Sequence, residues 1–137
     1  MKVAELMRTP VLTVDADATV ADAVVTLADA HVSALPVLDS RGRLMGVLSS
    51  TDVLAATAES DPERRAEVME TPVRLLMTPR TLTIDPSAGV REAAQQLLYA
   101  DVHRLFVTEQ GRVVGVVSSS DLVRAIATGA MARNGAD

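Results

Sequence analysis

A short polar motif occurs twice in this sequence and holds its most chemically versatile side chains. Residues 46–52 read GVLSSTD and residues 115–121 read GVVSSSD, so a glycine, a hydroxyl and a carboxylate recur at the same spacing. In each copy, hydroxyl residues separate an apolar run from the apolar start of a helix, which places Ser49 and Ser118 at helix N-termini. Unpaired amides at a helix N-terminus attract anions such as phosphate.

The carboxylates of the motif, Asp52 and Asp121, each lie one turn inside the predicted helix. A carboxylate supplies two acceptor oxygens, which suits a vicinal diol such as that of ribose. Ordinary helix capping would explain a single copy, because a serine cap and an acidic residue in the first turn both stabilise a helix. The second copy at the same spacing favours ligand binding, and capping stays the alternative.

The motif ends a longer internal repeat. Leu6-Met7 matches Leu76-Met77, and the apolar pattern of residues 32–37 matches that of residues 102–107 at the same offset along the chain. From the hairpin glycines Gly42 and Gly111 onward the offset is shorter by a single position, which indicates a deletion in one hairpin. Each repeat is too small to bury its own apolar faces, so two repeats must share their packing.

Each repeat predicts the same elements in the same order: a short strand, a helix, a hairpin and a second helix. Apolar residues at 20, 23, 24 and 27 follow the spacing of a buried helical face, and residues 90, 93, 94 and 97 repeat it. We therefore expect an α+β fold in which the two repeats pack with pseudo-two-fold symmetry. The expected boundaries are 1–57 for the first repeat, 58–72 for a helical connector, 73–128 for the second repeat and 129–137 for a C-terminal tail.

The composition argues against several classes of function. Aromatic residues make up 1% of the 137 and the net charge is −5, so the chain lacks the stacking platforms and basic surface typical of nucleic-acid-binding proteins. Cysteine is absent, which excludes thiolate metal sites and suits a reducing cytoplasm. No apolar run approaches the ~20 residues of a membrane span, and the N-terminus lacks a signal-peptide core. We expect a cytoplasmic protein without nucleic-acid or membrane partners.

Catalysis is not indicated either. The sequence has no phosphate loop of the GxxxxGK type, no HExxH metal motif and no GxSxG nucleophile elbow. His31 and His103 occur in corresponding regions of the two repeats but at unmatched positions. We therefore expect no enzymatic activity, no catalytic residues, no metal site and no required cofactor.

The motifs resemble those of a tandem pair of CBS (cystathionine β-synthase) domains, also called a Bateman module. Leu35-Pro36-Val37 precedes the motif of the first repeat and Leu105-Phe106-Val107 precedes that of the second, and the resemblance extends over about residues 3–127. It implies a disc-like unit with two clefts. Many such pairs bind AMP, ADP, ATP, S-adenosylmethionine or NAD in these clefts.

The resemblance also implies which residues line the clefts, each of which would draw on both repeats. The aspartates would hold the ribose, the serines would approach phosphate or ribose, and apolar residues would sandwich the adenine. One cleft would combine Ser49 and Asp52 with Thr81, Leu82, Val102, His103 and Arg104, and the other would combine Ser118 and Asp121 with Val11, Leu12, Val32, Ser33 and Ala34.

The two clefts are expected to differ in charge. Arg104 would offer a bidentate fork for phosphate in one cleft, with His103 as a second donor, whereas residues 33–34 contribute only serine and alanine to the other. We therefore expect phosphorylated ligands in the cleft that holds Arg104, and adenosine-like ligands or none in the other. Arg8 or Arg80 could change this expectation by supplying a cation to the second cleft.

The predicted function is that of a freestanding regulatory module that binds an adenosine-containing ligand of the AMP, ADP and ATP class and acts either on an effector protein or through its own assembly. The alternative is a dimerisation or scaffold module whose clefts are empty or hold another adenosyl ligand, such as S-adenosylmethionine or NAD. We also expect a homodimer, because apolar residues near the ends of each half are left uncovered by one disc. These residues are Val53, Leu54, Leu122, Val123, Ile126 and Met131.

Overall fold

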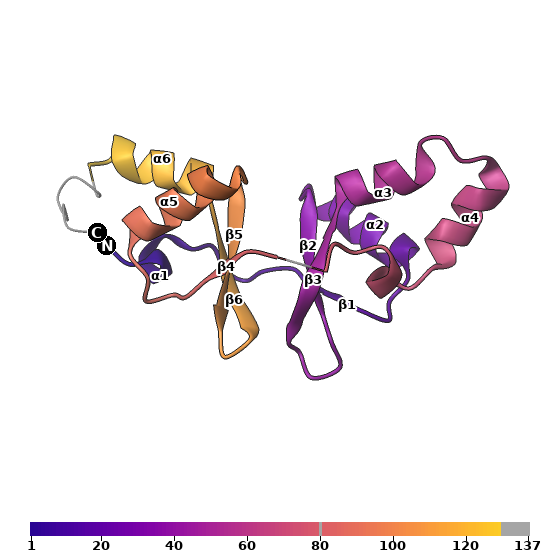
Figure 1. The fold of residues 1–137 in the computed structure, drawn as a ribbon, viewed down its shortest axis with the longest axis horizontal. Coiled ribbons are helices and arrows are strands. Elements are labelled where there is room, and N and C mark those ends of the chain that lie inside the picture. Colours follow the sequence, from indigo (N-terminus) through magenta and orange to yellow (C-terminus); the bar gives the residue numbers. More distant parts are fainter. Residues whose placement is uncertain (80, 130–137) are drawn as a thin grey trace. The chain divides into compact units, whose positions relative to one another are not determined.

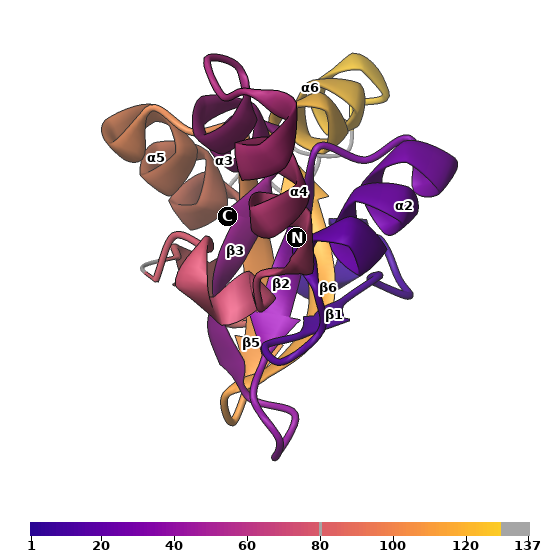
Figure 2. The same cartoon turned by 90° about the vertical axis from the view of Figure 1, so that its right-hand side faces the viewer.

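The computed structural model describes residues 1–79 and 81–129, and these residues form two compact units (Figure 1). The first-repeat unit runs from Leu12 to Thr81. The second-repeat unit joins Met1–Val11 to the chain from Leu82 onward. Each unit contains one three-stranded sheet, and helices lie on one side of that sheet (Figure 1, Figure 2).

In the first-repeat unit, the sheet has the order β1 (Val14–Asp15), β2 (Ala34–Leu38) and β3 (Leu44–Ser49). Strand β1 pairs with β2 in parallel, and β2 pairs with β3 as an antiparallel hairpin. The helices of this unit are α2 (Val20–Ala30), α3 (Ser50–Thr57), α4 (Pro62–Glu70) and the short 3-10 helix η1 (Val73–Leu75).

The second-repeat unit repeats this plan. Its sheet has the order β4 (Thr83–Ile84), β5 (Arg104–Glu109) and β6 (Arg112–Ser118), with the same parallel and antiparallel pairings. Its helices are α1 (Val3–Leu6), α5 (Val90–Ala100) and α6 (Ser119–Ala127). The predicted α+β class and the order of strand, helix, hairpin and helix in each repeat are therefore confirmed.

Local sequence explains why these elements begin and end where they do. The side chain of Thr19 caps α2 by accepting a hydrogen bond from the amide of Asp22 at 3.1 Å. The hairpin glycines Gly42 and Gly111 have φ angles of 79° and 80°, a backbone conformation that side chains disfavour. Three of the four residues predicted for the buried face of α2 lie in the core, and the fourth packs against it; the core residues are Val20, Ala23 and Leu27.

The compact units do not coincide with the expected sequence repeats, because each unit includes the first residues of the other repeat. The side chain of Val3 is buried in the core of the second-repeat unit, and its amide donates to the carbonyl of Ala88 at 2.8 Å. In the first-repeat unit, residues 73–78 fill the same role, and Val73 is fully buried. The repeat boundaries expected at residues 57 and 73 stay predictions, and the contacts group the chain differently.

The apolar residues expected at a dimer interface divide into two groups. Val53 and Leu122 are buried in the cores of their own units, so naming them as uncovered surface was wrong. They point inward because they lie on the faces of α3 and α6 that contact their own cores. Leu54, Val123 and Ile126 are exposed, each by more than 60%. Met131 lies outside the described residues, as does Arg80.

Candidate ligand-binding site

Both copies of the polar motif run from the last residues of a strand into a helix. Ser49 and Ser118 are the N-caps of α3 and α6. In the first copy, Ser49 Oγ accepts from the amide of Asp52 at 3.0 Å, and Asp52 Oδ2 accepts from the amide of Ser49 at 2.9 Å. The second copy forms the same reciprocal bonds at 3.2 Å and 2.8 Å. Each motif is thus a capping box, which occupies one carboxylate oxygen and leaves the other for further partners.

The second oxygen of Asp52 accepts from a neutral hydroxyl. Thr78 Oγ1 donates to Asp52 Oδ1 at 3.2 Å and to Oδ2 at 3.4 Å. Asp52 itself is partly exposed. A carboxylate has room for about four hydrogen bonds, so Asp52 keeps acceptor capacity for a ligand such as a vicinal diol.

Asp121 has the same position in its motif but very different surroundings. It is only 3% exposed, and its Oδ2 accepts both the amide and the hydroxyl of Ser118, at 2.8 Å and 2.9 Å. Its Oδ1 accepts from Nε of Arg8 at 2.8 Å and from Nη1 of Arg124 at 3.2 Å. Burial by itself would raise the pKa of the Asp121 carboxyl, but the hydrogen bonds from Ser118 and Arg8 outweigh it and lower the pKa below its usual range.

The glycine of each motif allows the chain's own segment to approach the sheet. At Gly46, an added Cβ would collide with the carbonyl oxygen of Thr78 and lie 3.0 Å from Met77 Sδ. At Gly115, an added Cβ would lie 2.5 Å from Met7 Sδ and 2.9 Å from Met7 Cγ. A glycine without a side chain permits such a close approach, and the group that approaches each motif glycine belongs to this chain.

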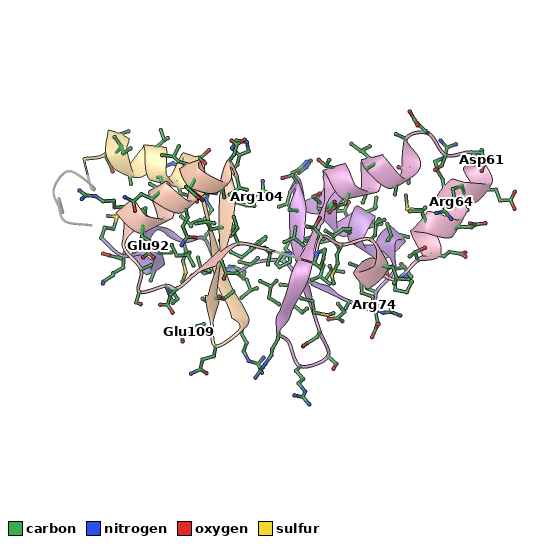
Figure 3. All side chains as sticks on the ribbon, viewed as in Figure 1. Asp61, Arg64, Arg74, Glu92, Arg104 and Glu109 are labelled. Carbon is green, nitrogen blue, oxygen red and sulfur yellow. The ribbon has the colours of Figure 1, made fainter. Side chains whose placement is uncertain are left out.

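Hairpin pairing brings some of the remaining predicted site residues to the capping serines. Ala34 pairs with Ser49, and the amide of Ser50 donates to the carbonyl of Ser33 at 2.9 Å. In the second-repeat unit, Arg104 pairs with Ser118 at the start of β5, where Figure 3 labels it, and the carbonyl of His103 accepts from the amide of Ser119 in the same way. Among the predicted site residues outside the two motifs, five are exposed and five are partly buried. The exposed ones are Leu12, Val32, Ser33, Leu82 and His103, and the partly buried ones are Val11, Ala34, Thr81, Val102 and Arg104.

The predicted combinations across the repeats stay predictions. Asp52 belongs to the first-repeat unit, whereas His103 and Arg104 belong to the second. Within its own unit, Asp52 lies in the first turn of α3. The N-cap of that helix, Ser49, pairs with Ala34 of β2.

Sequence reasoning missed two residues that contact the motif aspartates. Thr78 follows Leu76-Met77 just as Arg8 follows Leu6-Met7, so the alignment of the repeats could have marked the two as equivalent. Arg124 lies three positions after Asp121 on α6, a spacing at which helical side chains of opposite charge meet. Its counterpart in the first repeat is Ala55.

Residues 1–79 and 81–129 contain neither a metal-binding cluster nor a membrane-spanning helix. No group of three or more histidine, aspartate or glutamate side chains lies close enough together there to hold a metal ion. No helix in this part of the chain has the length and apolar character needed to cross a membrane.

Comparison with known proteins gives a consistent picture. The model of the CBS domain family matches residues 3–59 and again residues 67–128. A CBS domain-containing protein of Dictyostelium discoideum is 30% identical over an alignment of 127 residues that covers 88% of this chain and 88% of that protein. An A-adding tRNA nucleotidyltransferase of Aquifex aeolicus is 29% identical over 126 residues, but this chain spans only 14% of its length.

The fold has close counterparts among solved structures. The crystal structure of CBSX2 in complex with AMP superposes with a TM-score of 0.79 and 30% sequence identity. The superposition covers 93% of this chain and 96% of that chain. CBSX2, which shares this fold, is thus a protein that binds AMP.

Proposed function

Since this chain belongs to the CBS domain family and carries two copies of the domain, we propose that it is a regulatory module that binds an adenosine-containing ligand of the AMP, ADP and ATP class. The observation that carries the proposal is the carboxylate of Asp52, which is partly exposed at the start of a helix. Beyond the capping box, its partner among the described residues is the neutral hydroxyl of Thr78. CBSX2, which is 30% identical, is similar over nearly its whole length and has AMP bound.

The chemistry of the site supports a binding role rather than a catalytic one. Asp52 offers acceptor oxygens, and the amides at the start of α3 favour negative charge, but neither group forms or breaks a bond. Our proposal therefore includes no reaction and no required cofactor. It retains the cytoplasmic location and the effector protein that the sequence predicts.

A specific observation also favours the alternative, a scaffold module with empty clefts or with S-adenosylmethionine or NAD. Both capping boxes are complete without any ligand, so the motif has a structural role in either case. The two candidate functions differ in whether AMP, ADP or ATP binds at all, because S-adenosylmethionine and NAD also carry a ribose diol that could use the second oxygen of Asp52.

Calorimetric titration separates these candidates. We expect at least one of AMP, ADP and ATP to bind with a dissociation constant of roughly 1 μM to 1 mM, which corresponds to about −8 to −4 kcal/mol. The 2′,3′-dideoxy form of the same ligand should bind at least about tenfold more weakly, because it cannot donate to the carboxylate. Binding of S-adenosylmethionine or NAD alone would favour the alternative ligands, and no heat with any of them would favour the scaffold.

We also propose that the chain forms a homodimer through α3 and α6. Leu54, Val123 and Ile126 expose large apolar side chains on these helices, and exposed apolar surface of this kind marks interfaces. Light scattering should give about twice the chain mass of 14.4 kDa. Ile126→Glu should lower the measured mass toward the monomer, whereas Leu98→Glu, at an exposed apolar position on α5, should not. A monomer at high micromolar concentration of the unmodified protein would contradict the proposal.

A further inference from the structure

Arg8 and Thr78 occupy equivalent places in the two units. The backbone of Arg8 exchanges hydrogen bonds with Val116 of β6, at 2.8 Å and 3.2 Å. The backbone of Thr78 exchanges the same pair with Val47 of β3, at 3.0 Å and 2.8 Å. Both side chains are thereby delivered to the motif aspartate of their own unit.

The two side chains satisfy their aspartates to different degrees. Thr78 donates one hydroxyl hydrogen over a distance of 3.2 Å, and Ala55, the counterpart of Arg124, has no donor to add. Arg8 donates its Nε at 2.8 Å, and Arg124 adds a second guanidinium to the same oxygen. The formal charge around Asp121 is therefore positive once both arginines are included, whereas the pair of Asp52 and Thr78 is negative.

We propose that Arg8 is a specificity-determining residue that closes Asp121 to a ribose diol, so that Asp52 is the single diol-binding carboxylate of the two motifs. This inference rests on the proposed function. Each oxygen of Asp121 already accepts two hydrogen bonds, which uses its acceptor capacity. A diol hydroxyl would have to displace a charge-assisted guanidinium bond, and such bonds are roughly twice as strong as neutral ones.

The surface next to Asp121 agrees with this inference. A pocket of about 170 Å³ lies there, lined by Leu6, Asp121, Arg124, Ala125 and Thr128. Its volume is below the roughly 300–1,000 Å³ typical of small-molecule sites. Arg124 contributes to the pocket wall while bonded to Asp121, so a guanidinium donor lies beside the carboxylate there.

The test gives Asp121 the neighbours that Asp52 has and counts the ligand-binding sites per chain. Calorimetry with AMP should give about one site per chain for the unmodified protein. The double variant Arg8→Thr/Arg124→Ala reproduces the surroundings of Asp52 and should raise the count to about two, and adding Asp121→Ala should return it to about one. The reciprocal Thr78→Arg should weaken the original site about tenfold or more.

The outcomes separate this inference from the function on which it rests. Two sites in the unmodified chain, or one site that survives Asp52→Ala with its affinity unchanged, would overturn the inference and leave the function standing. If AMP, ADP and ATP bind to no variant, the proposed function fails and the inference fails with it. Should the double variant not fold, Asp52→Ala decides: loss of the only high-affinity site supports the inference, and retention of that site overturns it.

Discussion

Replacing Asp52 with alanine should weaken binding of an adenosine-containing ligand by about ten- to a hundred-fold. The carboxylate would be the ionised acceptor for the ribose hydroxyls, and hydrogen bonds to a charged group contribute about 1.5–3 kcal/mol. The amide of Ser49 and the hydroxyl of Thr78 would also lose their partner, so the change removes a local network as well as one bond. Calorimetric titration of Asp52→Ala against the unmodified chain measures the loss.

The variant also loses half of a capping box, and a matched control separates this cost from the loss of a ligand contact. Asp61, labelled in Figure 3, caps α4 by accepting from the amide of Arg64 at 2.8 Å and lies outside the motif. Asp61→Ala should lower the free energy of unfolding by about 0.5–2 kcal/mol without changing affinity. Equal affinities for Asp52→Ala and Asp61→Ala would mean that Asp52 does not contact the ligand.

Gly46→Ala should destabilise the protein by about 1–3 kcal/mol, which is the usual cost of overpacking a tight contact. The new methyl group would meet the backbone carbonyl of Thr78, which is held by its hydrogen bond from the amide of Val47 at 3.0 Å. This collision can be relieved only if strand β3 or residues 77–79 move. Urea denaturation of both proteins gives the difference in the free energy of unfolding. The same movement would draw the Thr78 hydroxyl away from Asp52, so ligand affinity should fall as well.

Gly115→Ala is the matched comparison in the other unit, and it should cost less. Its new methyl group would meet mainly the Sδ and Cγ atoms of Met7, which belong to a flexible side chain that can adopt another rotamer. Equal destabilisation by the two substitutions would show that the Thr78 backbone yields as easily as a methionine side chain. That result would also remove the reason to expect an effect of Gly46→Ala on ligand affinity.

The sequence by itself determined the elements and the way they begin. The spacing of Val20, Ala23 and Leu27 predicts the buried face of α2 because helical periodicity is a local property. The reciprocal bonds of Ser49 with Asp52 likewise join residues three positions apart, so capping was readable from the motif. The repeat was readable too, because finding it requires only comparison of the chain with itself.

Tertiary structure alone decided which side chain reaches each motif aspartate from a distant part of the sequence. Arg8 and Asp121 are 113 residues apart, and no local pattern indicates that they meet at 2.8 Å. They meet because the segment Met1–Val11 packs into the second-repeat unit, where Arg8 pairs with β6 through its backbone. Two nearly identical motifs thus acquire different distant partners, the neutral hydroxyl of Thr78 for Asp52 and the guanidinium of Arg8 for Asp121, because packing and not sequence spacing brings these side chains to the aspartates.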